Sequence, residues 1–394
     1  MKTNVAVFFG GESVEHEVSI ISAVQAMHAM DREKYEVIPV YISKQGMFFY
    51  HADMTEIEPF RDLDHLIRNS RKVLFVRTDN GVEMVDAVGG FSKRKALFRI
   101  DFAFPVVHGT NCEDGTLQGY FELLGLPYAG CDVLSSALGM DKVYFKNVLE
   151  ANGLPVLPCV SFSGREWAAN REQIAQRIEK ELGYPVVVKP ANLGSSVGIK
   201  KASDRSTLLE AISLAASFSG KILAEKAVEQ LREINCAVLG DRDGAQASAC
   251  EEPLMSDEIL SYQDKYISGT KSSGAKGMSS LKRRLPAEIS PEKKEEIQNL
   301  ALRTFEVCGF AGVTRIDFLM DTANGDQVYI NEANTIPGSL AFYLWEADGM
   351  KYTQLLDRII ALGFVRQRRK QNLMFTVDTN ILSTTSFGTK GAKG

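Results

Sequence analysis

Two carboxylates and an amide in the C-terminal half of the chain have the spacing of a divalent-cation site. The segment VTRIDFLMDTANGDQVYINEAN contains Asn324-Gly325, a dipeptide typical of two-residue turns between antiparallel strands. Because strand side chains alternate faces, such a turn would bring four polar side chains to one side of the hairpin. These are Arg315, Asp317, Glu332 and Asn334, with Asp317 opposite Glu332 and Arg315 opposite Asn334. Opposed carboxylates repel unless a cation lies between them, and an all-oxygen set suits Mg²⁺ held together with substrate phosphates. The alternative is a solvated hairpin face whose arginine neutralises both acids.

Glycine, serine and lysine in a second segment are suited to binding phosphate. The segment GYPVVVKPANLGSSVGIKK places Lys189 at the end of an apolar strand, before a turn that contains Ser195 and Ser196. Such a turn offers N–H groups and hydroxyls to phosphate oxygens, and lysine adds positive charge. It is not a Walker loop, because GxxxxGK[ST] is absent, and GGESVEHE does not match the GxGxxG of dinucleotide sites. An ordinary tight turn between strands is the alternative.

Two glutamates are candidate contacts for the rest of a nucleotide. Glu225 lies at the end of a predicted strand in ILAEKAVEQLRE, and Glu233 follows on the same segment. Carboxylates accept hydrogen bonds from an adenine amino group and from ribose hydroxyls. Surface acids would show the same pattern, so both interpretations stay open.

The elements that must position these residues begin with an open parallel α/β sheet. Residues 4–9 and 35–42 are apolar runs that predict buried strands, and the helix predicted between them has apolar residues at helical spacing. Another apolar strand is predicted at 101–109, followed by a helix that ends at Gly125. Strands that alternate with helices favour parallel pairing.

Two further units complete the predicted α/β and α+β architecture. After an N-terminal domain over residues 1–137, a small α+β domain is expected over 138–222, and a third domain over 223–366 contains the hairpin. A tail over 367–394 has no assigned function. The segment 262–284 is rich in Gly, Ser and Lys, a composition typical of a surface loop, and we expect it to act as a lid.

The composition excludes several classes of protein. The 394 residues are 45% apolar, 9% aromatic and 24% charged, as in a globular chain rather than a collagenous, disordered or coiled-coil one. A formal charge of −5 gives no reason to expect a nucleic-acid-binding surface, and no apolar run approaches the roughly 20 residues of a membrane span. Six cysteines without a CxxC pair predict reduced thiols, and the N-terminus lacks the apolar core of a signal peptide. We therefore expect a cytoplasmic enzyme.

Seven motifs, taken in order, resemble those of the D-alanine:D-alanine ligases of the ATP-grasp superfamily. They are GGESVEHEVS (10–19), HGTNCEDGTLQG (108–119), GLPYAGCDVLSSALGMDK (125–142), KPANLGSSVG (189–198), SYQDKY (261–266), RIDF (315–318) and NEANTIPG (331–338). The resemblance spans residues 4–365 and implies a three-domain ATP-grasp fold that grips ATP between its second and third domains. It implies a cytoplasmic, homodimeric ligase that uses ATP and Mg²⁺, or Mn²⁺, to join two D-alanines through an acyl phosphate for peptidoglycan precursor synthesis. Nucleic acid and membrane are not implied as partners.

The resemblance also assigns roles to residues of the amino-acid sites. Glu15 would bind the ammonium of the first D-alanine, with Val18 beside its methyl group. Ser195 and Tyr266 would form a hydrogen-bonded set with Glu15. His108 and Glu113 fall in a motif that lines the amino-acid sites, although a strand-end histidine with both nitrogens satisfied is the alternative for His108.

Further roles concern the nucleotide and the reacting atoms. Lys142, Lys189 and the lid residue Lys265 would contact ATP phosphates, beside Ser195 and Ser196. Glu225 and Glu233 would take the adenine and ribose, and Asp317, Glu332 and Asn334 match the Mg²⁺ ligands. Arg315 and the Gly338 N–H would stabilise the oxyanion formed when the second amine attacks.

Departures from the family pattern affect the second substrate. Tyr343 stands where the family usually has a serine that helps to hold the second substrate's carboxylate, Glu346 replaces a usual proline, and Cys112 replaces a glycine. A D-alanine ligase with D-serine, D-lactate or another amino acid as second substrate is therefore an alternative. A non-catalytic nucleotide-binding relative is a third hypothesis.

Overall fold

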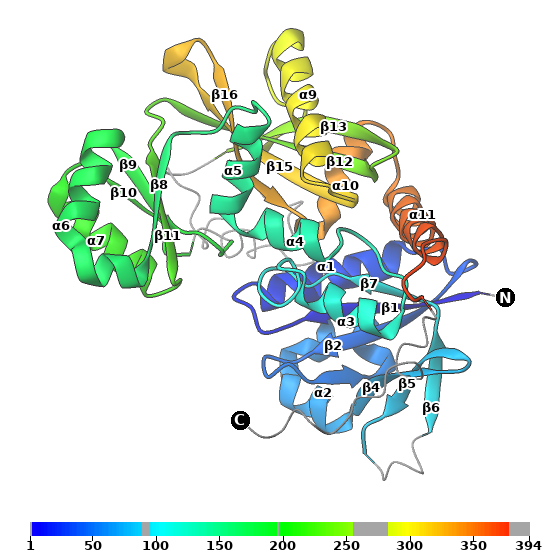
Figure 1. Ribbon diagram of the computed structural model, residues 1–394. Coiled ribbons are helices and arrows are strands. Elements are labelled where there is room, and N and C mark those ends of the chain that lie inside the picture. The colour runs from blue at the N-terminus through cyan, green and yellow to red at the C-terminus, as the bar shows by residue number, and fades with distance from the viewer. Residues whose placement is uncertain (1, 89–94, 195–196, 255–282, 378–394) are drawn as a thin grey trace.

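The N-terminal sheet of the computed structural model is mixed. The structure describes residues 2–88, 95–194, 197–254 and 283–377. The seven strands lie in the order β6-β5-β4-β3-β2-β1-β7 (Figure 1). They are β1 (Thr3–Gly10), β2 (Tyr35–Ile42), β3 (Phe48–Tyr50), β4 (Arg71–Thr78), β5 (Gly81–Asp86), β6 (Ala96–Ile100) and β7 (Phe102–Pro105). The predicted parallel pairing is confirmed for β2, β1 and β7, whereas β3 to β6 pair antiparallel.

Helices pack on this sheet and carry the first sequence motifs. They are α1 (His16–Ala29), α2 (Leu63–Asn69) and α3 (Thr116–Leu124), with 3₁₀ helices at Ala52–Thr55 and Glu58–Asp62. Strand β1 is apolar along almost its whole length, as expected of a strand covered on both faces. Strand β4, which lies further along the sheet, has alternating burial, because one of its faces is more exposed.

A four-stranded antiparallel sheet follows, in the order β10-β9-β11-β8. Two short helices, α4 (Val133–Met140) and α5 (Lys142–Ala151), precede it. The sheet consists of β8 (Cys159–Ser163), β9 (Val186–Pro190), β10 (Lys200–Ala202) and β11 (Lys221–Lys226). Helices α6 (Gly164–Glu181) and α7 (Arg205–Ala216) cover one face and share a hydrophobic core with it (Figure 1).

The third sheet has the order β14-β13-β12-β15-β16. Its strands are β12 (Leu231–Asp241), β13 (Gly244–Pro253), β14 (Arg283–Arg284), β15 (Gly312–Asp321) and β16 (Gln327–Asn334). Helix α9 (Pro291–Val307) packs on β12 and β13, and a 3₁₀ helix (Gly338–Ala341) leads into α10 (Phe342–Ala347). The last helix, α11 (Tyr352–Gln371), returns to pack against α1 and joins the core of the N-terminal sheet. The segment 367–394 therefore begins as the end of a helix.

The hairpin of β15 and β16 has the predicted pairing at the candidate site but not the predicted turn. Asp317 pairs with Glu332 and Arg315 with Asn334, as expected. The prediction of a two-residue turn is wrong, because a 3₁₀ helix (Thr322–Asn324) joins the strands and Asp321 pairs with Gln327. A β-bulge beyond Phe318 shifts the register and restores the predicted pairs at the end that carries the acids.

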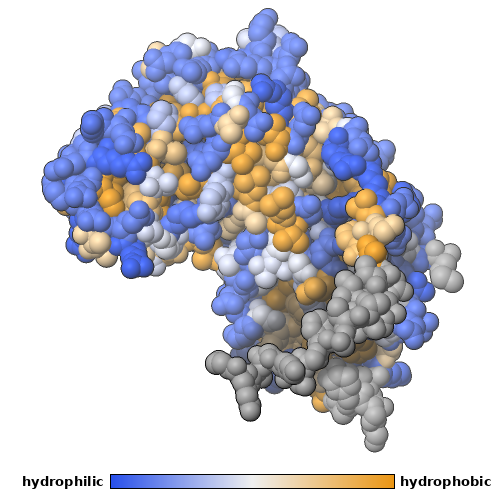
Figure 2. All heavy atoms as spheres, in the orientation of Figure 1, coloured by the Kyte–Doolittle hydropathy of each residue, from blue (hydrophilic) through white to orange (hydrophobic). Residues whose placement is uncertain are grey.

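The surface differs between the parts of the molecule. Figure 2 shows mainly hydrophilic residues over α6, and hydrophobic residues gathered around the region of α4 and α5. Within the described ranges, no helix combines the length and apolar character that a membrane crossing requires. All six cysteines are free thiols, as predicted.

Candidate active site

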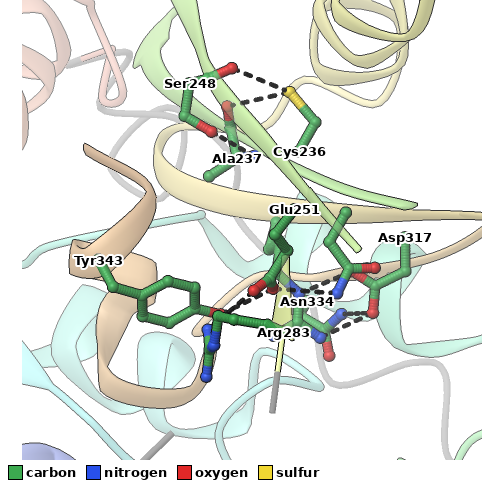
Figure 3. A network of polar contacts seen from close by, with 10 residues as sticks. Cys236, Ala237, Ser248, Glu251, Arg283, Asp317, Asn334 and Tyr343 are labelled. Atoms are coloured by element: carbon green, nitrogen blue, oxygen red, sulfur yellow. Dashed lines mark hydrogen bonds and ion pairs between the residues drawn. The ribbon is translucent and has the colours of Figure 1, made fainter. Parts of the chain in front are cut away.

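The hairpin face carries a buried arginine that binds one of the two acids. The Arg315 Nε and Nη2 atoms donate to Asp317 Oδ1 at 2.6 Å and Oδ2 at 2.7 Å. Asn334 Nδ2 donates to Asp317 Oδ2 at 3.0 Å (Figure 3). Burial alone would lower the pKa of Arg315, but the adjacent Asp317 carboxylate outweighs it and holds that pKa well above its ordinary value. Arg315 thus neutralises Asp317, and the other acid has a different partner.

That partner is Lys142, one of the three lysines predicted to contact phosphates. Lys142 begins α5, and its Nζ donates to the Leu193 carbonyl at 2.8 Å and lies 3.1 Å from Glu332 Oε2. The second, Lys189, ends β9, and its Nζ donates to Asn331 Oδ1 at 3.0 Å. Because Asn331 lies at the bulge of β16, both ammonium groups meet the acid-bearing end of the hairpin.

A third lysine, not predicted from the sequence, completes a buried positive cluster. Lys146 is 1% exposed, and its Nζ lies 3.1 Å from Glu225 Oε2, while Lys189 Nζ lies 2.5 Å from Glu225 Oε1. Burial raises the pKa of Glu225, but Lys146 and Lys189 together lower it to about 2. Two ammonium groups share one carboxylate, so this cluster favours an anion nearby. Lys146 follows Lys142 by one helical turn, and this spacing was the signal that could have identified it.

A cavity adjoins this cluster. It has a volume of about 320 Å³ and lies between β9, β11 and β15. Its lining combines apolar side chains (Leu157, Val187, Leu231, Leu319) with Glu225 and the chain from Lys226 to Gln230. Glu233 pairs with Leu319 across the ladder, and paired residues project from the same face. Of the two glutamates predicted to contact the nucleotide, Glu225 lines this cavity, and Glu233 projects from the same sheet face as the lining residue Leu319.

The first motif places Glu15 against two glycines from other segments. Glu15 precedes α1, and its Oε2 atom lies close to Gly109 and Gly194. A Cβ atom built on Gly109 would lie 3.2 Å from Glu15 Oε2, and one built on Gly194 would lie 3.3 Å from it. Val18 lies within the first turn of the same helix and is largely buried. Gly194, the residue directly before Ser195 in the sequence, thus lies beside Glu15. Ser195, Ser196, Lys265 and Tyr266 themselves lie outside the described residues.

Glu113 and His108 both hold the backbone of Ile336. Glu113 Oε2 accepts from the Gly109 N–H at 2.8 Å, and its Oε1 accepts from the Ile336 N–H at 3.0 Å. Burial, and secondarily the Glu15 carboxylate, raise the pKa of Glu113 to about 8. His108 is 2% exposed, with Nδ1 2.8 Å from the Ile336 carbonyl and Nε2 2.9 Å from Ser22 Oγ. Both nitrogens of His108 are hydrogen-bonded within the protein, as in the alternative interpretation of a strand-end histidine that does not bind substrate.

Tyr343 is part of a buried polar network that the sequence did not reveal. Its hydroxyl donates to Glu251 Oε1 at 2.9 Å (Figure 3). Arg283 Nη1 donates to Glu251 Oε2 at 2.8 Å, and its guanidinium lies 3.9 Å from the Tyr343 ring centroid. Asn235 Nδ2 also donates to Glu251, at 3.1 Å. At the position where the family serine would help to hold a substrate carboxylate, the tyrosine hydroxyl is thus bound to a carboxylate of the protein itself.

The backbone at Cys112 shows why a cysteine can stand where the family has a glycine. The positive φ in this turn falls at Asn111 (φ 67°), flanked by Gly109 and Gly115, rather than at Cys112. Asparagine tolerates the left-handed region better than most residues. Cys112 is buried, so the turn does not require a glycine at its position.

The donor set on the hairpin fits a hard divalent cation. In the described part of the chain, no three or more His, Cys, Asp or Glu side chains form a metal-binding group. Asp317 and Glu332 are cross-strand neighbours, however, and the Asn334 amide that donates to Asp317 through Nδ2 carries Oδ1 at its other end. Two carboxylates and one amide oxygen are ligands that Mg²⁺ accepts when nucleotide phosphates and water complete its shell.

Together, a lysine cluster, an apolar cavity and an acidic hairpin face define a nucleotide-dependent enzyme. The sequence matches two family models, "D-ala D-ala ligase N-terminus" over residues 4–131 and "D-ala D-ala ligase C-terminus" over residues 148–361. The chain therefore belongs to the D-alanine–D-alanine ligase family of ATP-dependent ligases. The resemblance and the ATP-grasp fold inferred from the motifs are confirmed.

Individual relatives match along nearly the whole chain. A D-alanine–D-alanine ligase of Thermosipho melanesiensis is 40% identical over 380 residues, which cover 96% of this chain and 98% of that protein. A D-alanine–D-alanine ligase of Caldicellulosiruptor bescii is 41% identical, and the match covers 95% of this chain and 99% of that protein. Among solved structures, the D-alanine-D-alanine ligase of Coxiella burnetii has a TM-score of 0.77 at 28% identity, covering 94% and 96%. The VanG D-Ala:D-Ser ligase of Enterococcus faecalis has a TM-score of 0.76 at 30% identity, covering 92% and 100%.

Proposed function

We propose that the protein joins two D-alanines in an ATP-dependent reaction through an acyl phosphate. The observation that carries the proposal is the meeting of three groups of residues at the end of the hairpin. Lysines of α5 and β9 lie against its acidic face, and Glu113 and His108 hold the turn that follows β16. Relatives with about 40% identity carry the corresponding name.

The first half-reaction requires neutralisation of phosphate charge. A carboxylate is a poor acylating agent, so its oxygen attacks the γ-phosphorus of ATP and ADP leaves. Lys142 and Lys189 would contact the phosphates, and Lys146 would raise the positive potential behind them. Stabilisation of this kind is electrostatic and needs no covalent bond to the protein.

Asp317, Glu332 and Asn334 would hold the metal. Bound Mg²⁺, or Mn²⁺, supplies positive charge on the nucleotide oxygens. Arg315 orients the Asp317 carboxylate through two hydrogen bonds, and Lys142 pairs with the Glu332 carboxylate.

The second half-reaction requires stabilisation of an oxyanion. The amine of the second D-alanine attacks the acyl carbon, the carbonyl oxygen takes up negative charge, and phosphate then leaves. Arg315 and the Gly338 N–H would donate to that oxygen. Glu15 and Val18 would hold the first D-alanine, with Ser195 and Tyr266 completing the set, and the 262–284 segment would exclude water from the acyl phosphate.

Three further parts of the proposal concern organisation. We propose three domains, at 1–137, 138–222 and 223–366, since each contains most of one of the three sheets, although β11 (Lys221–Lys226) crosses the second boundary. The six free thiols support a reducing cytoplasm as the location. A homodimer is supported by the family resemblance, and sedimentation velocity would test it.

A product assay tests the proposed function. Purified protein with ATP, Mg²⁺ and D-alanine is expected to release ADP and phosphate and to form D-alanyl-D-alanine, detected by mass spectrometry. D-Serine and D-lactate should be offered in competition, since Tyr343 occupies a position usual for serine. Turnover of another pair without D-alanyl-D-alanine would contradict the proposal, and absence of ADP release with every pair would indicate a non-catalytic relative.

A further inference from the structure

The turn that carries the Gly338 amide has an unusual backbone. Ser339, Leu340 and Ala341 are consecutive non-glycine residues with φ of 50°, 53° and 50°, in the left-handed region. Residues other than glycine rarely adopt this conformation, because the Cβ atom then crowds the following carbonyl oxygen. All three are buried, between α1 and β15. A backbone of this kind persists only where the surrounding structure holds it in place.

Three residues of the N-terminal domain hold this turn at its two ends. At its beginning, Ile336 is bound through both its N–H and its carbonyl, to Glu113 and His108. At its strained end, the Ser339 N–H donates to Ser22 Oγ at 3.0 Å. Ser22 lies on α1, and it is 1% exposed. Its hydroxyl also lies 2.9 Å from His108 Nε2, so the two ties share one network.

The protons of this network have one consistent arrangement. Burial lowers the pKa of His108, so its ring is neutral. Nδ1 faces the Ile336 carbonyl and must therefore donate, which leaves Nε2 as an acceptor. The Ser22 hydroxyl then donates to His108 Nε2 and accepts from the Ser339 N–H. Ser22 thus uses its hydroxyl both as donor and as acceptor, and alanine at this position would lose both bonds.

We infer that Ser22 is a positioning residue that aims the Gly338 N–H at the reacting acyl group. The Gly338 N–H itself makes no hydrogen bond to any part of the chain that the structure describes, whereas the N–H groups of Ile336 and Ser339 on either side are bound. The inference rests on the proposed function. Helix α1 also carries Val18 and follows Glu15, so the same helix that holds the first substrate would fix the oxyanion donor.

The chain offers a matched control one turn earlier on the helix. Ser19 is fully buried, donates to the Val106 carbonyl at 2.6 Å and accepts from the Gly10 N–H at 2.8 Å. Its hydroxyl therefore makes the same kinds of bond as that of Ser22. It ties α1 to β1 and to the residue after β7, however, and does not touch the 336–341 turn. Ser19→Ala should cost comparable stability without moving Gly338.

Positional isotope exchange separates the two half-reactions. Reversible formation of the acyl phosphate scrambles ¹⁸O from the β,γ-bridge of labelled ATP, and dipeptide formation reports amine attack. Removal of one oxyanion donor costs about 10²–10³ in rate, and displacement of a donor should cost less, about 10–100-fold. We expect Ser22→Ala to slow dipeptide formation by that factor and to raise the ratio of exchange to dipeptide accordingly, while Ser19→Ala leaves the ratio unchanged.

The possible outcomes decide between the roles. An unchanged ratio in Ser22→Ala, or an equal rise in Ser19→Ala, would overturn the inference, because loss of stability alone changes both half-reactions together. Ser22→Cys, a weaker acceptor that keeps a donor, should give an intermediate ratio and serves if Ser22→Ala does not fold. Wild-type protein that shows neither exchange nor dipeptide would overturn the proposed function itself. If wild-type protein shows both isotope exchange and dipeptide formation, and Ser22→Ala has the same ratio of the two, only this inference would be overturned.

Discussion

Replacement of Glu225 by glutamine tests the buried lysine cluster behind the phosphate site. The carboxylate is 3% exposed and lies between two ammonium groups, at 2.5 Å from Lys189 and 3.1 Å from Lys146. Glutamine has nearly the same shape but no charge. Glu225→Gln therefore leaves two ammonium groups buried side by side without a counter-ion.

The expected magnitude follows from the pKa of the glutamate. A folded-state pKa of about 2, against an ordinary 4.5, corresponds to about 3 kcal/mol at about 1.4 kcal/mol per pKa unit. Breaking a buried ion pair by removing one partner typically costs about 3–5 kcal/mol, in agreement. Because the pKa is lowered on folding, this contribution is fully present above about pH 4.5 and is lost as pH falls toward 2.

Urea unfolding at pH 7 measures the effect. We expect Glu225→Gln to lower the free energy of unfolding by about 3–5 kcal/mol, in the transition that includes the four-stranded sheet. Glu229→Gln, at an exposed residue of the same cavity, removes the same charge and should change stability by less than about 0.5 kcal/mol. Saturating ATP should restore more stability to Glu225→Gln than to wild type, because phosphates supply the missing anion. Equal unfolding midpoints for the two variants would refute the argument.

Three further predictions concern other residues of the site. Tyr343→Phe removes a hydrogen bond to the buried Glu251 carboxylate and should lower the free energy of unfolding by about 1.5–3 kcal/mol in urea; an unchanged midpoint would show that the hydroxyl contributes nothing. Arg315→Lys cannot reproduce the two bonds to Asp317 and should lower kcat by about 10²–10³, so a steady-state kcat within threefold of wild type would contradict the oxyanion role. The pKa of Glu113 is raised to about 8 from an ordinary 4.5, so the unfolded chain loses this proton first and the free energy of unfolding should fall as pH rises between those values. Urea midpoints measured at pH 5.5, 7 and 8.5 should decline less for Glu113→Gln than for wild type. Identical declines would argue against the raised pKa.

The hairpin shows what side-chain alternation can predict. The sequence placed Asp317 opposite Glu332 correctly, because both acids follow from counting along two strands. The prediction of a two-residue turn was wrong, because the loop is longer. A bulge between Asp317 and Phe318 shifts the register back, so the predicted pairs still form. A bulge leaves no mark in residue types, and it matters here because it lies where Asn331 meets Lys189.

Contacts between distant segments could not be predicted in the same way. Glu251 and Arg283 bind each other and surround Tyr343, yet neither lies in a motif, and their pairing depends on how β13, β14 and α10 meet. The antiparallel half of the N-terminal sheet was missed because β3 is only three residues long and its apolar pattern is weak. By contrast, the motifs did single out Lys142 and Lys189, and the fold brings both of them beside the hairpin.

The proposed mechanism requires the acidic face of the hairpin to bind the metal that accompanies the nucleotide. Anomalous diffraction from crystals grown with Mn²⁺ and ADP locates that ion directly. We expect one strong peak within coordinating distance of Asp317, Glu332 and the Asn334 amide oxygen, and loss of that peak in Asp317→Asn. Nucleotide bound in the cavity at Glu225 with its Mn²⁺ held by other residues would contradict it.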